Sequence, residues 1–132
     1  MSLPLNPPAI ILVRPQLGMN IGAVARAMLN FGLTELRLVQ PRDGWPNPDA
    51  GPSAAGADKV IENARVFDGV AEAIADCHLT IGTAQTTRDM VRRVTSPAGC
   101  VAELQALPGK SALLLGPERT GLVREDLLKC HA

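Results

Sequence analysis

Aromatic side chains are scarce in this sequence of 132 residues, which has two Phe, one Trp and no Tyr. Many modules that bind single-stranded RNA stack the bases on exposed aromatic rings. The composition therefore argues against that class of RNA-binding protein, and it leaves other kinds of RNA binder open.

The sequence also has no excess of charge of either sign, because 13 basic and 13 acidic residues cancel. A surface that binds nucleic acid over the whole molecule would need a basic excess. Any RNA-binding surface must therefore be local. The one clearly basic segment, residues 84–96, carries Arg88, Arg92 and Arg93. These arginines form either an arm that contacts phosphates or an ordinary solvated loop.

Cysteines, histidines and long apolar runs are also too few to suggest a disulfide-rich protein, a metalloprotein or a membrane protein. The three cysteines are odd in number and widely spaced, which suggests neither a disulfide framework nor a zinc site. His78 and His131 have no cysteine or carboxylate at metal-ligand spacing, so we expect no metal, and His78 is more simply structural. No apolar run approaches the ~20 residues of a membrane span, and no signal peptide is evident. We expect a single cytoplasmic domain without membrane contact.

The common nucleotide-binding and hydrolase motifs are missing. Residues 18–22 have the spacing G-x-x-x-G instead of the dinucleotide-binding G-x-G-x-x-G. Neither G-x-x-x-x-G-K-[ST] nor G-x-S-x-G occurs. A Rossmann fingerprint, a P-loop and a nucleophile elbow are therefore all without support.

What the sequence does contain is an alternation of short apolar runs with helical patterns. The runs predict strands at 9–13, 36–39, 64–67, 78–83 and 111–115. Helices are expected at 21–31, 53–61, 70–77, 101–107 and 123–130, with Asn20, Ser53 and Asp68 as N-caps of the first three. Such alternation implies right-handed crossovers between parallel strands. The predicted fold class is α/β, a mostly parallel sheet with helices on both faces.

The strand at 111–115 leads into a glycine-rich loop, residues 116–121. Ligands of open α/β sheets bind at the carboxyl ends of the strands, and Gly116 and Gly121 permit close backbone approach. We predict that the loop holds a ligand. The alternative is an ordinary turn between strand and helix that binds nothing. Gly82 and Thr83 end their strand at the same edge and would face the same ligand.

Two charged residues near these elements have two interpretations each. Arg26 follows Gly22 by one helical turn, so its guanidinium projects over whatever approaches that glycine. The alternative is a solvated helix arginine. Glu118 on the loop either orients a ligand or pairs with Arg119 or Arg124.

Three segments together resemble motifs of the SPOUT-class, TrmH-like RNA 2′-O-methyltransferases. They are Asn20–Arg26 (NIGAVAR), Ile81–Ala84 (IGTA) and Leu114–Leu122 (LLGPERTGL), which are similar to the first motif, middle strand and second motif. The resemblance covers nearly the whole chain in the right order. Within the family it is closest to the TrmJ-type enzymes that methylate riboses in the tRNA anticodon loop. This closeness depends on NIGAVARAM, on LRLV at 36–39, on AAGA at 54–57 and on LKCH at 128–131.

The resemblance implies a fold with a C-terminal trefoil knot that binds S-adenosylmethionine, in a homodimer with active sites near the subunit interface. Asn20 and Arg26 would serve the reacting ribose. The residues implied to bind the cofactor are Gly82, Thr83, Ala84, Gly116, Glu118, Gly121 and Leu122. The candidate RNA contacts are Arg14, Arg88, Arg92 and Arg93.

The chemistry explains why an arginine would be needed. A ribose 2′-OH is a poor nucleophile, and a fixed cation such as Arg26 favours its alkoxide and holds it in line with the methyl group. An arginine does not readily lose its proton, so the expected role is electrostatic activation and positioning. The cofactor itself carries the reactive methyl group.

The third motif of the family, a final strand and a loop leading into the last knotted helix, does not occur in this sequence. We therefore expect a domain truncated at its C-terminus that does not complete the knot, binds S-adenosylmethionine weakly and turns over little. Isothermal titration calorimetry tests this, and micromolar binding would contradict it. The leading hypothesis is a tRNA ribose 2′-O-methyltransferase. The alternatives are an rRNA ribose 2′-O-methyltransferase and a non-catalytic RNA-binding or dimerisation module of the same fold.

Overall fold

One parallel sheet organises the chain in a computed structural model, which describes residues 7–83, 109–117, 122, 126, 129 and 130. The sheet has the strand order β3-β2-β1-β5-β4, and all of its neighbouring strands are parallel. The strands are β1 Ala9–Val13, β2 Leu36–Val39, β3 Arg65–Phe67, β4 Leu79–Gly82 and β5 Ser111–Leu115. The described helices are α1 Gly18–Asn30, α2 Ala50–Ala54, α3 Asp58–Glu62 and α4 Val70–Ala73. The predicted α/β class is confirmed.

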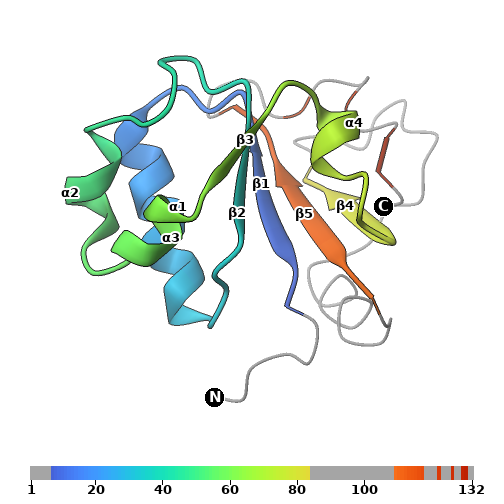
Figure 1. Cartoon of the computed structure of the whole chain (residues 1–132), viewed down its shortest axis with the longest axis horizontal. Coiled ribbons are helices and arrows are strands. Elements are labelled where there is room, and N and C mark those ends of the chain that lie inside the picture. The colour runs from blue at the N-terminus through green and yellow to red at the C-terminus, as the bar shows by residue number, and fades with distance from the viewer. Residues whose placement is uncertain (1–6, 84–108, 118–121, 123–125, 127–128, 131–132) are drawn as a thin grey trace.

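The central strand β1 is buried on both faces, as its unbroken apolar run predicts. Ile10 and Leu12 belong to a core packed against α1, α2 and α3, which we call the α1-side core. Ile11 and Val13 belong to a second core that includes residues of α4, the α4-side core. Figure 1 shows α1, α2 and α3 on one side of the sheet and α4 on the other. The sheet is therefore the middle layer of three.

Helix α1 begins earlier than the sequence pattern indicated. It starts at Gly18, its N-cap is Leu17, and no side chain caps it. The backbone N–H groups of Asn20 and Ile21 both donate to the Leu17 carbonyl, at 3.1 and 3.3 Å, and so close the first turn. The prediction that Asn20 is the N-cap is wrong, because Asn20 already lies inside that turn.

The predicted helix at 53–61 is also wrong, since two short helices, α2 and α3, take its place. The break falls at Ala55 and Gly56, whose φ angles of 42° and 96° are left-handed and cannot continue a right-handed helix. Ser53 lies within α2 and donates its hydroxyl to the Ala50 carbonyl at 3.2 Å, so it is not an N-cap.

Helix α4 is shorter than expected and has a different cap. It ends at Ala73 instead of reaching residue 77, and its N-cap is Gly69, without a side-chain hydrogen bond. Asp68 therefore does not cap it. The predicted helices at 101–107 and, apart from isolated residues, at 123–130 lie outside the described residues. Within the described residues, no helix is long and apolar enough to cross a membrane.

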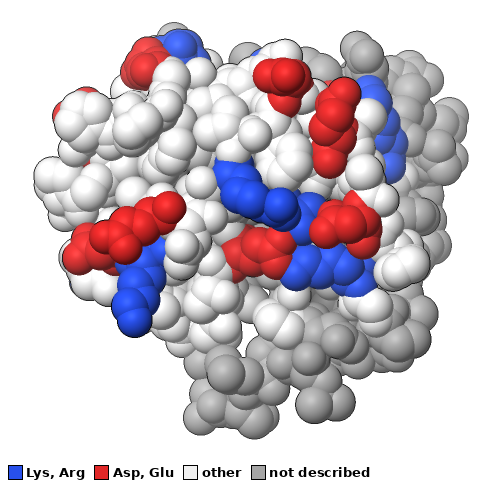
Figure 2. All heavy atoms as spheres, in the orientation of Figure 1, with Lys and Arg blue, Asp and Glu red and all other residues white. Residues whose placement is uncertain are grey.

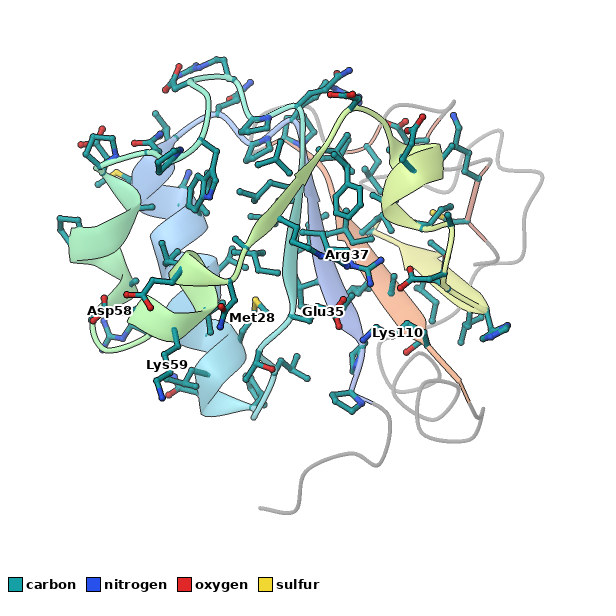
Figure 3. All side chains as sticks on the ribbon, viewed as in Figure 1. Met28, Glu35, Arg37, Asp58, Lys59 and Lys110 are labelled. Atoms are coloured by element: carbon teal, nitrogen blue, oxygen red, sulfur yellow. The ribbon has the colours of Figure 1, made fainter. Side chains whose placement is uncertain are left out.

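A buried arginine ties together the edge of the sheet where the strands begin. Arg37 of β2 is 1% exposed and donates to the Ala73 carbonyl at 2.6 Å, to both oxygens of Asp76 at 2.7 and 2.9 Å, and to Glu35. Lys110, just before β5, also pairs with Glu35. Figure 3 shows Arg37, Glu35 and Lys110 close together. Figure 2 shows that basic and acidic side chains lie side by side on this face of the molecule. We call these four side chains the Arg37 network.

The network shifts the ionisation of both carboxylates in the same direction. The hydrogen bond from Arg37 lowers the pKa of Asp76 despite partial burial. Burial alone would raise the pKa of Glu35, but the hydrogen bonds from Lys110 and Arg37 outweigh it and leave that pKa lowered. Both carboxylates are therefore held in the charged form, which suits a structural tie between β2, β5 and the end of α4.

Candidate functional site

Three adjacent strands of the sheet end at one place and bring the predicted site segments together. In the sheet β1 lies beside β5 and β5 beside β4, with Leu12 opposite Leu115 and Gly82 opposite Leu114. Arg14, Gly116 and Thr83, which follow these strands, therefore lie along one edge. We call this the carboxyl edge. The prediction that the glycine-rich loop starts at the edge where β4 ends is confirmed for its described residues, Gly116 and Pro117.

Thr83 is fixed to the neighbouring strand at this edge. Its N–H and its hydroxyl both donate to the Leu114 carbonyl, at 3.1 and 3.2 Å. The residue is nonetheless exposed, and Gly82 and Gly116 beside it are only partly buried. The edge thus presents main chain and small side chains, held rigidly by the ladder between β4 and β5, to whatever binds there.

Gly22 has a packing role that the sequence left undecided. A Cβ at this position would lie 2.0 Å from the Ser53 hydroxyl and 2.1 Å from the Ala50 carbonyl oxygen. Helix α2 therefore occupies the space beside Gly22, and no ligand approaches the helix there. Close packing of α1 on α2 therefore accounts for the glycine at this position.

Asn20 and Arg26 lie at different distances from the carboxyl edge. Helix α1 starts beside that edge and runs back along the sheet (Figure 1), so Arg26 lies about 9 Å farther along the axis than Asn20 at roughly 1.5 Å per residue. Asn20 is partly buried and Arg26 is exposed. Among the described residues, the Arg26 side chain has no ion-pair partner. The structure therefore brings Asn20, and not Arg26, near the loops of the carboxyl edge.

Arg14 leaves β1 in an unusual backbone conformation and is held at both ends. Its φ is 49°, and its N–H donates to the Val39 carbonyl at 2.7 Å. Its Nη2 donates to Oδ2 of Asp126 at 2.5 Å. Asp126 is a residue that the sequence interpretation missed. The signal for it was weak: Leu122, Asp126 and Cys130 follow one another at helical spacing, and all three are buried.

Comparisons with known proteins agree with this arrangement. The model of the SpoU rRNA methylase family matches residues 7–132. The chain belongs to this family. It is 43% identical over 126 residues to the tRNA (cytidine/uridine-2′-O-)-methyltransferase TrmJ of Escherichia coli K12, covering 92% of this chain and 50% of that protein. The chain spans about half the length of the curated relatives it matches.

Solved structures of family members have the same fold. The crystal structure of TrmJ from Z. mobilis ZM4 superposes with a TM-score of 0.90 at 54% identity, over 94% of this chain and 56% of that one. The SpoU methyltransferase AviRb from Streptomyces viridochromogenes, solved with the cofactor AdoMet, has a TM-score of 0.66 at 16% identity, over 95% of this chain and 46% of that one. At that identity the second likeness concerns the fold alone.

The remaining predicted site residues of this family member fall into two groups. Leu122, a predicted cofactor contact, is 8% exposed and packs in the α4-side core. The others lie outside the described residues: Ala84, Glu118, Gly121, Arg88, Arg92 and Arg93. In the described part of the chain, no three His, Cys, Asp or Glu side chains gather as a metal site would require.

Proposed function

We propose that this chain is the methyltransferase domain of an S-adenosylmethionine-dependent enzyme that methylates the ribose 2′-OH of tRNA. The observation that carries the proposal is the carboxyl edge, where the end of β4 and the start of the second motif lie beside the end of β1, in a chain 43% identical to TrmJ. A tRNA substrate also favours a cytoplasmic location. An rRNA substrate is the second candidate, because SpoU rRNA methylase is the description of the family.

S-adenosylmethionine, when bound, supplies a methyl group on a sulfonium centre, so the protein itself needs no covalent catalyst. The described residues that would hold it are Gly82, Thr83 and Gly116, and Leu122, a further predicted contact, is buried in the α4-side core. Their main chain and small side chains fit a ligand that must approach the backbone closely. The same role is proposed for Ala84, Glu118 and Gly121.

Arg26 and Asn20 are proposed to act on the ribose. A guanidinium stays protonated, so Arg26 would stabilise the developing alkoxide and hold it for in-line transfer. Asn20, closer to the carboxyl edge, would orient the sugar by hydrogen bonding. The exposure of Arg26 fits an active site that is completed by the RNA near the interface of a homodimer.

A transfer assay with the protein expressed from its complete reading frame tests the reaction. Unmodified tRNA and rRNA transcripts are incubated with radiolabelled S-adenosylmethionine, and the nucleosides are then resolved by mass spectrometry. We expect label in tRNA as 2′-O-methylcytidine or 2′-O-methyluridine. Label in rRNA alone favours the second candidate, and label in neither RNA favours a non-catalytic module. Sedimentation velocity of the same sample tests the homodimer.

A variant tests the ribose-side assignment. Arg26→Ala should lower kcat by about 100- to 1000-fold, the range for removal of one preorganised electrostatic group, with little change in cofactor affinity. Lys59→Ala, an exposed cation on α3, is the matched control and should leave kcat unchanged. Full activity of Arg26→Ala would remove the assignment.

A further inference from the structure

The ion pair between Arg14 and Asp126 joins two segments that are 112 residues apart in the chain. Arg14 directly follows β1 at the carboxyl edge and precedes the first motif, which begins at Asn20. Asp126 follows the second motif and lies between Leu122 and Cys130, two residues of the α4-side core. An acidic residue between two core positions needs a partner, because an unpaired buried carboxylate is strongly unfavourable. Arg14 is that partner.

The two ends of the pair differ in their exposure to solvent. The side chain of Asp126 is 7% exposed and that of Arg14 is 35% exposed. The negative end therefore lies inside the protein, and the positive end faces outward at the carboxyl edge. A guanidinium has five N–H donors in a rigid fork, and towards the described residues only one of its nitrogens, Nη2, donates. On the outward side, further donors of the guanidinium would be the ones to meet an oxyanion.

The main chain of Arg14 is also held in place. A non-glycine residue with positive φ is uncommon, and at a sheet edge it persists only where the surroundings impose it. Here the hydrogen bond from the Arg14 N–H to the Val39 carbonyl anchors the turn. Arg14 is therefore held both at its main chain and at its guanidinium, although it lies outside regular secondary structure.

We propose that Asp126 is a positioning residue that orients Arg14 to bind a backbone phosphate of the RNA substrate. The proposal rests on the proposed function, because it gives that function one contact to RNA. Phosphate is favoured as the oxyanion because an oriented guanidinium suits bidentate recognition of it. Asp126 touches neither RNA nor cofactor and acts only through Arg14.

Kinetics of Asp126→Asn in the protein from the complete reading frame tests the proposal. The neutral amide keeps the shape but releases the arginine side chain, whose regained rotamer freedom opposes binding. We expect the KM for tRNA to rise about five- to tenfold, with kcat and the KM for S-adenosylmethionine unchanged. Arg14→Gln should raise the KM for tRNA at least as much and lower the salt dependence of tRNA binding by about one counterion.

A double variant and a matched control distinguish a positioning role of Asp126 from a purely structural one. In the Arg14→Gln background, Asp126→Asn should add no further change to the KM for tRNA. Asp43→Asn removes the partner of Arg42 in an exposed pair, 3.1 Å apart, and should leave every parameter unchanged. Thermal melting of each variant identifies loss of folding. If Asp126→Asn fails to fold, the KM of Arg14→Gln for tRNA still decides whether Arg14 contacts RNA.

The other outcomes overturn the proposal in distinct ways. A rise in the KM for S-adenosylmethionine instead would make the cofactor carboxylate the oxyanion. Reduced stability with an unchanged KM for tRNA would make the pair purely structural. If the unmodified protein transfers no label to tRNA yet binds it, and both variants weaken that binding, the proposed function fails while the positioning role stands.

Discussion

At the scale of single residues, the glycine of the first motif changes meaning between sequence and structure. Gly22 sits in a segment that resembles a ligand-binding motif, yet its missing side chain makes room for Ser53 and the Ala50 carbonyl of α2. Gly51, in α2 itself, has no atom of another element within 4 Å of where a Cβ would lie. The same residue type therefore serves tight packing in one helix and has no steric requirement in the next.

These two glycines make a matched pair for mutation. Gly22→Ala should destabilise the protein by about 1–3 kcal/mol, because a backbone carbonyl only 2.1 Å away cannot give way without moving α2. Gly51→Ala should change stability by less than about 1 kcal/mol, because the better helix propensity of alanine is opposed by the strain that a Cβ meets in helical backbone before Pro52. Urea midpoints at unchanged slope measure both. Equal effects of the two changes would contradict the packing role of Gly22.

A second prediction at this scale concerns the thiol of Cys77. Burial raises its pKa to about 11, although the nearby charge of Arg37 partly offsets the shift. At pH 8 the folded protein should therefore react with a disulfide reagent on the order of 100-fold more slowly than the unfolded chain does, because the thiolate is the reactive form. The measurement uses Cys100→Ser/Cys130→Ser protein with and without urea. Equally fast reaction in both states would show that the thiol is not protected.

At the scale of elements, the helix ends and the opposite edge of the sheet were the least predictable parts. The apolar runs gave every strand at nearly its observed bounds, most directly for β1, which is buried on both faces and apolar throughout. The break between α2 and α3 depends on a left-handed Ala55, which its residue type disfavours. The Arg37 network joins β2 to the residue before β5 and to the segment after α4, and no local sequence pattern predicts such a contact.

The network predicts loss of stability in acid. The pKa values of Asp76 and Glu35 lie below their ordinary values of 3.8 and 4.5, so the unfolded state binds more protons than the folded state as the pH falls. Their contribution should be complete above about pH 5 and should decline as the pH falls through 4.5 and 3.8 towards the lowered folded-state values. Urea midpoints between pH 7 and pH 3 measure this. Asp76→Asn should flatten the decline, and an unaltered pH profile in that variant would refute the assignment.

At the scale of the whole molecule, one sheet separates two cores, and its central strands β2, β1 and β5 each contribute side chains to both. Trp45, the single tryptophan, packs against the α1-side core, and Ile11 lies fully buried in the α4-side core. Strand β1 contributes alternate side chains to both cores. If one layer of helices loses its packing, the strand that supports the other layer is disturbed as well. The two layers should therefore unfold together.

This cooperativity is testable with Trp45 as the probe. Urea unfolding followed by Trp45 fluorescence and by far-ultraviolet circular dichroism should give coincident transitions. Ile11→Ala, on the opposite face, should destabilise the protein by about 2–5 kcal/mol and shift both transitions equally. A fluorescence transition that stays in place while the dichroism transition moves would mean that the layers unfold separately.

The amino-acid sequence by itself determined the parallel α/β architecture, the edge at which β4 ends and the glycine-rich loop starts, and the family. These follow from apolar periodicity and from contiguous motifs, which are properties of neighbouring residues. Only the tertiary structure decided that Gly22 serves helix packing, that Arg37 ties three elements together, and that Asp126 holds Arg14. Each of these is a contact between residues distant in the chain, fixed by strand order and by the close packing of side chains, so it exists only once the sheet is assembled.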